Sequence, residues 1–444
     1  MANQDLATAS LVTSALKSNA VFIEVDGSVR RITIDKLMDV INSGDEMLLR
    51  QVAWGVPIKQ NQSSQSWGVI GNLGMRDEYE SKCGRYLVTP SGLAAKLSAT
   101  NSGVYADGTT LVESKGNVMF IAPRLYYVVK EDAASGVPYL WLSQLPIGGH
   151  YIGNCNNDEY VCIGAYVGSM SGSSLVSRSG ATPANNKTIE QFWTAAQTVG
   201  KDWGLTDYDH RRFMMMYALG HYGNPNIQTS LGNGVGGGAG GWQSVSSACV
   251  ALKTGATKSL GDSWAKIDID PLVNGDGYQT INSSRVNVGG IEDPYNWIQE
   301  LLQGVYCGSS DNADQDGTEI FIYKGNRMPT AAELSTHPSG DYRQISRINT
   351  SGFVKTRNIG EYFDLNATAV GGGVSSYWGS YYNSTEPSTA QVCSIGGRAC
   401  DALWAGLDMF NTICGYEFKY VDYGSRLAYY GSLVFVSGAQ LVAA

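Results

Sequence analysis

Charged residues are scarce in this chain of 444 residues: Asp, Glu, Lys and Arg together make up 16% of it, and the net charge is -9. No run rich in Lys or Arg occurs, which argues against a protein that grips the phosphate backbone of a nucleic acid. No apolar run approaches the roughly 20 residues that a membrane-spanning helix needs. The N-terminus also lacks the basic and apolar regions of a signal peptide. We therefore expect no nucleic-acid partner and no membrane insertion.

Cysteine and histidine are also few. Eight cysteines are scattered along the chain without a C-x-x-C pair, so we expect reduced core thiols rather than a disulfide framework. The four histidines lie far apart, and His210 and His221 are separated by about three helical turns, too far to share one ion. These patterns predict no metal centre, no cofactor and no catalytic residue.

Three other motifs suggest chemistry that their details do not support. The glycine-dense run 229–242 lacks the Lys-Ser/Thr of a phosphate-binding loop, so we interpret it as a turn or flexible loop. Residues 312–317 imitate the start of a calcium loop, but Tyr323 stands where the bidentate acid is needed, which leaves a polar turn and a calcium site both open. Glu292 and Asp293 are adjacent, and on an extended chain they would point to opposite faces, so we interpret Glu292 as a structural turn or cap residue.

Glycine is abundant instead, at 54 residues, and its mixture with Ser, Asn and Tyr is typical of a loop-rich β protein. Alternation around an Asp-Gly pair predicts a hairpin over 21–34, followed by a short helix over 35–41. The segment to about residue 108 is polar and broken, as in a linker. Strands are predicted at 118–123, 125–129, 139–146, 161–170 and 321–325.

Two helices are predicted in the middle of the chain. Thr188 and Gln191 form a capping-box pattern at the start of the first one. The second would begin after Thr206 or Asp207 and stop at a glycine, Gly220 or Gly223.

The C-terminal region is rich in aromatic residues, with 12 of them among the 56 residues from Ser375 to Tyr430. Between the Gly-Gly pair at 396–397 and Gly424, large aromatic and polar residues follow neither a helical nor a sustained strand period. Tyr and Trp give a large contact area at low entropic cost, and polar neighbours add specificity. This mixture favours a recognition surface, although a final strand pair with a loop would also fit it.

The same stretch carries a resemblance. Gly396–Gly397, then Ala405–Leu407, Phe410–Asn411 and Gly424–Leu427 resemble the frame of the variable region in phage receptor-binding proteins diversified by retroelements, the major tropism determinant type. The two helices, Asn224–Gln228 and Gly290–Pro294 are similar to other segments of that family. The resemblance implies an α+β, C-type-lectin-like fold of the formylglycine-generating-enzyme-like branch over 109–444. Residues 1–108 would be a virion-attachment module and linker, and the variable region would span about 375–426.

The resemblance also implies a function and a site. The chain would be the receptor-binding protein of a phage or prophage, a homotrimer at a tail fibre or tail tip, extracellular after lysis. Its partners would be other virion tail proteins and a bacterial surface protein or glycan. Phe410 and Arg426 would belong to the scaffold. The predicted ligand contacts are Tyr377, Trp378, Tyr381, Asp401, Leu403, Trp404, Asp408, Tyr416, Glu417, Lys419, Tyr420, Asp422 and Tyr423.

Other functions remain open at this point. The chain could be a structural virion protein, such as a baseplate or decoration subunit, with a lectin-like fold and no host contact. A hydrolase or an oxidase on the same scaffold is a third class, since formylglycine-generating oxidases use a cysteine pair with copper. Cys393, Cys400 and Cys414 lie in that general region, but their spacing of 7 and 14 residues and the lack of the rest of that site argue against catalysis. We therefore expect a binding protein and not an enzyme.

Overall fold

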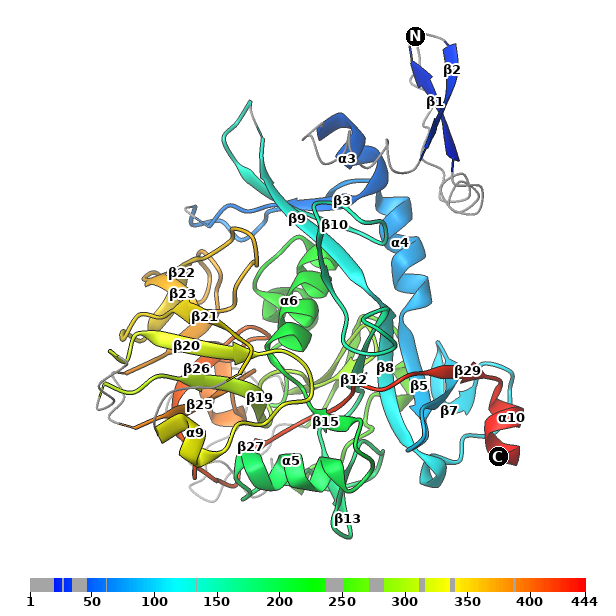
Figure 1. Ribbon diagram of the computed structural model, residues 1–444, viewed down its shortest axis with the longest axis vertical. Coiled ribbons are helices and arrows are strands. Elements are labelled where there is room, and N and C mark those ends of the chain that lie inside the picture. Colours follow the sequence, from blue (N-terminus) through cyan, green and yellow to red (C-terminus); the bar gives the residue numbers. More distant parts are fainter. Residues whose placement is uncertain are drawn as a thin grey trace.

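Sheets dominate the structure of this chain, a computed structural model with 35% of its residues in strands and 19% in helices. It describes residues 20–25, 28–33, 46–60, 62–132, 134–236, 251–270, 283–310, 316–335, 340–385 and 389–444. One sheet is curled into a half-barrel, and the helices are few (Figure 1). The α+β class predicted from the sequence is thereby confirmed.

A sheet of eight strands brings residues 84–105 together with the C-terminal strand β29. Its order is β15-β28-β12-β8-β5-β6-β29, with β7 paired to β6. In Figure 1 the C-terminal β29 and α10 lie beside β5 and β7. The strands are β5 (Gly84–Val88), β6 (Leu93–Ser98), β7 (Asn101–Tyr105), β8 (Asn117–Pro123), β12 (Tyr160–Gly164), β15 (Trp203–Leu205), β28 (Leu427–Tyr429) and β29 (Val434–Val436).

A second sheet has five strands in the order β11-β9-β10-β3-β4. They are β3 (Trp54–Pro57), β4 (Ile70–Gly71), β9 (Leu125–Glu131), β10 (Pro138–Ser143) and β11 (His150–Ile152). In both sheets, strands from before residue 108 pair with strands from after it. The segment that we expected to be a linker up to residue 108 is therefore part of the main sheets from about residue 54, because its short apolar strands find partners far along the chain.

The third large sheet carries the C-terminal region. Its order is β21-β20-β19-β25-β26-β24-β22-β23, with β27 paired to β19. The nine residues of β19 are all buried. The strands are β19 (Gln299–Cys307), β20 (Glu319–Tyr323), β21 (Tyr342–Ser346), β22 (Gly352–Arg357), β23 (Ala367–Val370), β24 (Tyr381–Asn383), β25 (Gln391–Ile395), β26 (Phe410–Gly415) and β27 (Tyr423–Gly424).

Three small sheets complete the strands. The predicted hairpin over 21–34 is confirmed as β1 and β2, which pair only with each other among the described strands. The helix predicted over 35–41 lies outside the described residues. The small-sheet strands are β1 (Ala20–Val25), β2 (Ser28–Thr33), β13 (Ser169–Ser171), β14 (Ser174–Val176), β16 (Ala265–Asp268), β17 (Ser284–Val288) and β18 (Ile291–Glu292).

The two predicted helices begin at their predicted N-caps. Thr188 accepts the N–H of Gln191 at the start of α5, and Asp207 accepts the N–H of His210 at the start of α6. Gly223 ends α6 in the left-handed conformation. The helical segments are α3 (Glu46–Val52), α4 (Leu73–Lys82), η1 (Glu113–Lys115), α5 (Ile189–Gln197), α6 (Tyr208–Tyr222), α7 (Ile227–Leu231), η2 (Lys258–Leu260), α9 (Ala331–Ser335), η3 (Ala399–Trp404) and α10 (Gly438–Ala443).

Helix α6 lies at the centre of the molecule (Figure 1). It contacts β19 of the C-terminal sheet and both β3 and β11 of the five-stranded sheet. Residues on all sides of α6 are buried, including Arg211 and Arg212. The helix therefore ties two sheets together and holds the C-terminal sheet in place.

Candidate functional site

The two ends of the C-terminal region are fixed by backbone geometry. Gly396 and Gly397 have φ angles of 90° and 75°, a conformation that side chains disfavour. A Cβ on Gly396 would lie 2.7 Å from the carbonyl oxygen of Pro294. At the other end, a Cβ on Gly424 would lie 2.7 Å from the Ile298 side chain. These glycines are needed where they stand, so the ends of the region are rigid.

A buried triad of charges anchors the same region. The guanidinium of Arg426 donates to Glu300 at 2.7 Å, and Arg211 lies 3.6 Å from the other oxygen of that carboxylate. All three side chains are fully buried. Phe410 is also fully buried and packs edge-on against Tyr208. The prediction that Phe410 and Arg426 belong to the scaffold is confirmed.

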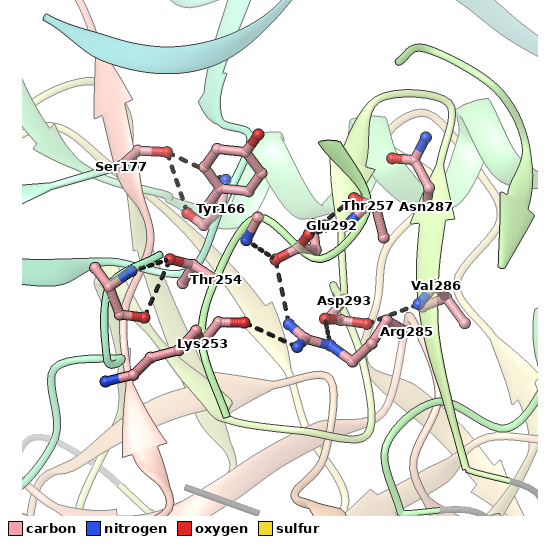
Figure 2. A network of polar contacts seen from close by, with 12 residues as sticks. Tyr166, Ser177, Lys253, Thr254, Thr257, Arg285, Val286, Asn287, Glu292 and Asp293 are labelled. Carbon is pink, nitrogen blue, oxygen red and sulfur yellow. Dashed lines mark hydrogen bonds and ion pairs between the residues drawn. The ribbon is translucent and has the colours of Figure 1, made fainter. Parts of the chain in front are cut away.

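A second buried network holds the turn before β19. Arg285 donates to Asp293 at 2.6 Å and to Glu292 at 3.2 Å, and Figure 2 shows the guanidinium between the two carboxylates. The prediction that these carboxylates point to opposite faces is wrong, because Asp293 has a φ of 42° and is not extended. Glu292 also accepts the N–H groups of Gly255 and Thr257. Its structural role is confirmed.

On this frame, the first patch is half-buried and is built from stacked aromatic rings. Tyr381 lies parallel to Trp404, with ring centroids 5.1 Å apart at 13°. Leu403 precedes Trp404 at the end of η3, and all three side chains are half-buried. We call these three residues the tyrosine–tryptophan patch. Tyr377 is also half-buried, with the Lys355 ammonium 5.6 Å from its ring.

The second exposed patch lies on the loop after β26. Glu417, Lys419 and Tyr420 are exposed, and Tyr420, at 53%, is the most exposed aromatic side chain of the described residues. Phe418 is half-buried and packs edge-on against Tyr423 at 4.7 Å. We call residues 417–420 the loop patch. The contact prediction omitted Phe418, although its place between Glu417 and Lys419 was a signal for it.

Arg398 links the two segments that carry the patches, because it contacts a carboxylate in each of them. It donates to Asp401 at 2.9 Å and lies 3.4 Å from Asp422. η3, which starts after Arg398, leads to Trp404, while Asp422 closes the loop that carries Tyr420. Burial raises the pKa of Asp422 to about 6, and the positive charge of Arg398 opposes this rise. The link fixes both patches to one cation.

Six predicted contact residues are buried, and we correct the prediction for them. Asp401 and Asp422 are held by Arg398, and Asp408 pairs with the buried Arg357 at 2.6 Å. A buried carboxylate needs such a partner, so these groups face inward. The other three are aromatic and fill the core, where their large apolar area is best used. The buried residues are Trp378, Asp401, Asp408, Tyr416, Asp422 and Tyr423.

The described cysteines form no disulfides, and two histidines make structural contacts. All the cysteines that the structure describes are free, and Cys249 lies outside those residues. Burial raises the pKa of Cys400 to about 12, which disfavours a thiolate. His210 completes the cap of α6, and His221 contacts Glu80 at 2.9 Å. Within the described ranges, no group of three or more His, Cys, Asp or Glu is placed to hold a metal ion.

Two other motifs are only partly covered by the structure. The central residues of the calcium-like segment, 311–315, and the glycine-rich residues after 236 lie outside the part of the chain that is described. Asp316 accepts the backbone N–H of Thr318 at 2.9 Å, as in a polar turn.

No protein-family description matches this chain, and no curated protein is significantly similar to it. Among the described residues, none of the helices has both the length and the apolar character that spanning a membrane requires.

Proposed function

We propose that this chain is the receptor-binding protein of a phage or prophage, and that it grips a bacterial surface protein or glycan through its C-terminal region. The observation that carries the proposal is the exposure of Tyr420, together with the half-buried, stacked pair of Tyr381 and Trp404, on a frame of buried ion pairs. Aromatic side chains on a rigid support lose little entropy on binding and dominate the energy of recognition surfaces.

We further propose that the frame is C-type-lectin-like and that the chain acts as a homotrimer on the virion. The packing of α5 and α6 against irregular strands is compatible with such a frame. Several copies on one particle would raise the avidity of a weak contact by about 100-fold or more. Residues 375–426 would be the part that varies, and the N-terminal part would attach to other tail proteins.

The test removes the exposed ring of Tyr420 and the two half-buried rings together. We expect the triple variant Tyr381→Ala, Trp404→Ala and Tyr420→Ala to lose at least about tenfold in binding to bacterial cells, since each ring contributes on the order of 1 kcal/mol or more. Fluorescently labelled protein would be titrated on a panel of bacterial strains and followed by flow cytometry. Tyr416 is left intact because it is buried.

A matched control is Leu73→Ala, which removes a large exposed side chain from α4, outside the C-terminal region. It should bind as the unaltered protein does. If the triple variant folds and still binds fully, the contact surface does not lie in this region. Failure of the unaltered protein to bind any strain, together with its presence in purified virions, would favour a structural virion protein instead.

The gene offers a second, independent test. An adenine-rich near-copy of the coding stretch for residues 396–426, next to a reverse-transcriptase gene, would mark the region as diversified. Its absence from the surrounding genome would contradict diversification while leaving receptor binding open to the cell-binding test.

A further inference from the structure

Two adjoining hollows lie in a different part of the C-terminal sheet. Their volumes are about 420 and about 670 Å³, within the range of small-molecule sites. Both are lined by Arg343 and Tyr362, which stand between them. None of the lining residues falls within 375–426, so these hollows are separate from the C-terminal patches.

The walls of the hollows offer flat aromatic faces. Tyr362 is 37% exposed and Tyr151 is 38% exposed, and His150 lies with its ring 5.9 Å from that of Tyr362. Arg343 lies over the Tyr362 ring, with its guanidinium carbon 4.2 Å from the ring centroid. Both tyrosines line the smaller hollow, and such exposed rings suit a ligand with flat, apolar faces.

The guanidinium of Arg343 is held in place by one partner, and some of its N–H groups remain free to bind a ligand. Its Nη2 donates to the buried Asp364 at 2.7 Å. Nε and Nη1 have no hydrogen-bond partner among the described residues. The three N–H groups of Nε and Nη1 therefore remain for a ligand that enters either hollow.

The charges of the hollows are balanced, which decides the class of ligand. Each lining cation has a carboxylate partner: Arg212 with Asp209, Lys324 with Asp158, Arg343 with Asp364, and Arg357 with Asp408. These partners neutralise the cations, and two carboxylates, Asp209 and Asp341, line the smaller hollow themselves, so an anionic ligand would find little net positive charge there. Hydroxyl groups, which both donate and accept, suit such mixed surroundings better.

Polar side chains for hydroxyl groups are present along the rim. Asp341, Gln344 and Asn358 are exposed at the lining of the hollows. The buried Asn366 lines the larger hollow, and its Oδ1 has no partner. Acceptors, donors and aromatic faces thus converge from β21, the loop after β22, β11 and the start of α6.

We infer that these hollows form a saccharide-binding groove, in which pyranose rings pack on Tyr362 and Tyr151 and ring hydroxyls bond to Arg343 and Asp341. The inference goes beyond the proposed function, because it uses none of the residues of the two patches. A chain of neutral sugars would cross from one hollow to the other over the Arg343–Tyr362 wall.

The experiment measures saccharide binding directly. The purified full chain is presented with neutral oligosaccharides of a few hexose or N-acetylhexosamine units, with matched uronic-acid oligosaccharides and with inorganic phosphate. Binding is followed by saturation-transfer NMR and titration calorimetry. We expect at least one neutral oligosaccharide to bind, and Tyr362→Ala to weaken it by about tenfold or more because a stacking face is lost.

Matched variants separate the groove from the C-terminal patches. Tyr362→Trp should retain binding, and Tyr420→Ala should leave it unchanged. Tyr151→Ala replaces Tyr362→Ala if the latter does not fold, as judged by circular dichroism. The inference is overturned if no neutral oligosaccharide binds, or if the folded alanine variant binds equally well. It is also overturned if only uronic acids and phosphate bind and about 0.5 M salt abolishes the binding, since screening of that kind marks an anion site.

Discussion

Asp422 is a buried carboxylate that helps to hold the C-terminal region in place through its pairing with Arg398. Its side chain is fully buried below the exposed loop patch, and one of its oxygens, Oδ1, has no hydrogen-bond partner. Burial raises its pKa from 3.8 to about 6, although Arg398 pulls it downward. The ionised form is therefore costly in the folded protein, and the pairing with Arg398 offsets only part of that cost.

The sign of the resulting pH dependence follows from this rise. Between about pH 4 and pH 6 the folded protein holds a proton that the unfolded chain has released, so this group favours folding less as the pH rises. We expect Asp422→Asn to gain stability relative to the unaltered protein between pH 4 and pH 7, by up to about 3 kcal/mol. Urea unfolding at a series of pH values measures the difference.

The control for this prediction is Glu417→Gln, which removes a carboxylate from the exposed face of the same loop. A stability difference between Asp422→Asn and the unaltered protein that stays constant over the pH series would show that Asp422 is ionised in the folded state throughout, contrary to the prediction.

The C-terminal end of α6 positions a neighbouring loop. The carbonyl oxygen of Gly223, at the end of α6, accepts the N–H groups of Trp67 and Gly68. Trp67 in turn packs edge-on against Trp378, which belongs to the C-terminal region. One left-handed residue therefore stops the central helix and positions a loop that supports the sheet of the candidate surface.

We expect Gly223→Ala to destabilise the protein by about 1–3 kcal/mol, because its φ is 61° and a Cβ would lie 2.5 Å from the backbone of Gly68. Thermal unfolding followed by circular dichroism measures the loss. Gly373→Ala is the matched control, since a Cβ there meets nothing within 4 Å and its φ is not positive. Equal melting temperatures for the two variants would contradict the proposed strain.

At the scale of the whole molecule, distant segments share one buried charge cluster. Glu300 of β19 lies between Arg211 of α6 and Arg426 near the C-terminal end of the region. Burial lowers the pKa of Arg211 to about 10, with the Glu300 carboxylate opposing the fall. The two cations need the single carboxylate, so the cluster fixes the helix, the sheet and the C-terminal segment together.

We expect Glu300→Gln to cost about 3–5 kcal/mol of unfolding free energy, because it leaves two buried guanidinium groups without a counter-charge. Arg211→Met should cost less, since Arg426 keeps its shorter bond to Glu300. Denaturant unfolding of both variants gives the comparison. A larger loss in Arg211→Met than in Glu300→Gln would refute the central place of the carboxylate.

Much of the fold could be predicted wherever a pattern is local. The caps of α5 and α6, the hairpin of β1 and β2, and the strands β8, β9 and β10 follow from neighbouring residues. The pairing of strands from before residue 108 with strands from after it could not be predicted from local patterns. The short strands between residues 54 and 98 pair with segments that lie far along the chain, and no local pattern reports such partners.

The sequence by itself determined the α+β class, the N-caps of α5 and α6, and the aromatic-rich composition of the C-terminal region, because each depends on residue type and near neighbours. The resemblance predicted the scaffold roles of Phe410 and Arg426. Only the tertiary structure decided which of those side chains reach solvent. Asp408 and Asp422 point inward because they form ion pairs with Arg357 and Arg398. Tyr420 is exposed to solvent. The same contacts between distant segments created the hollows beside Tyr362. Burial is a property of the packed whole, and for that reason it cannot be read from a single stretch of chain.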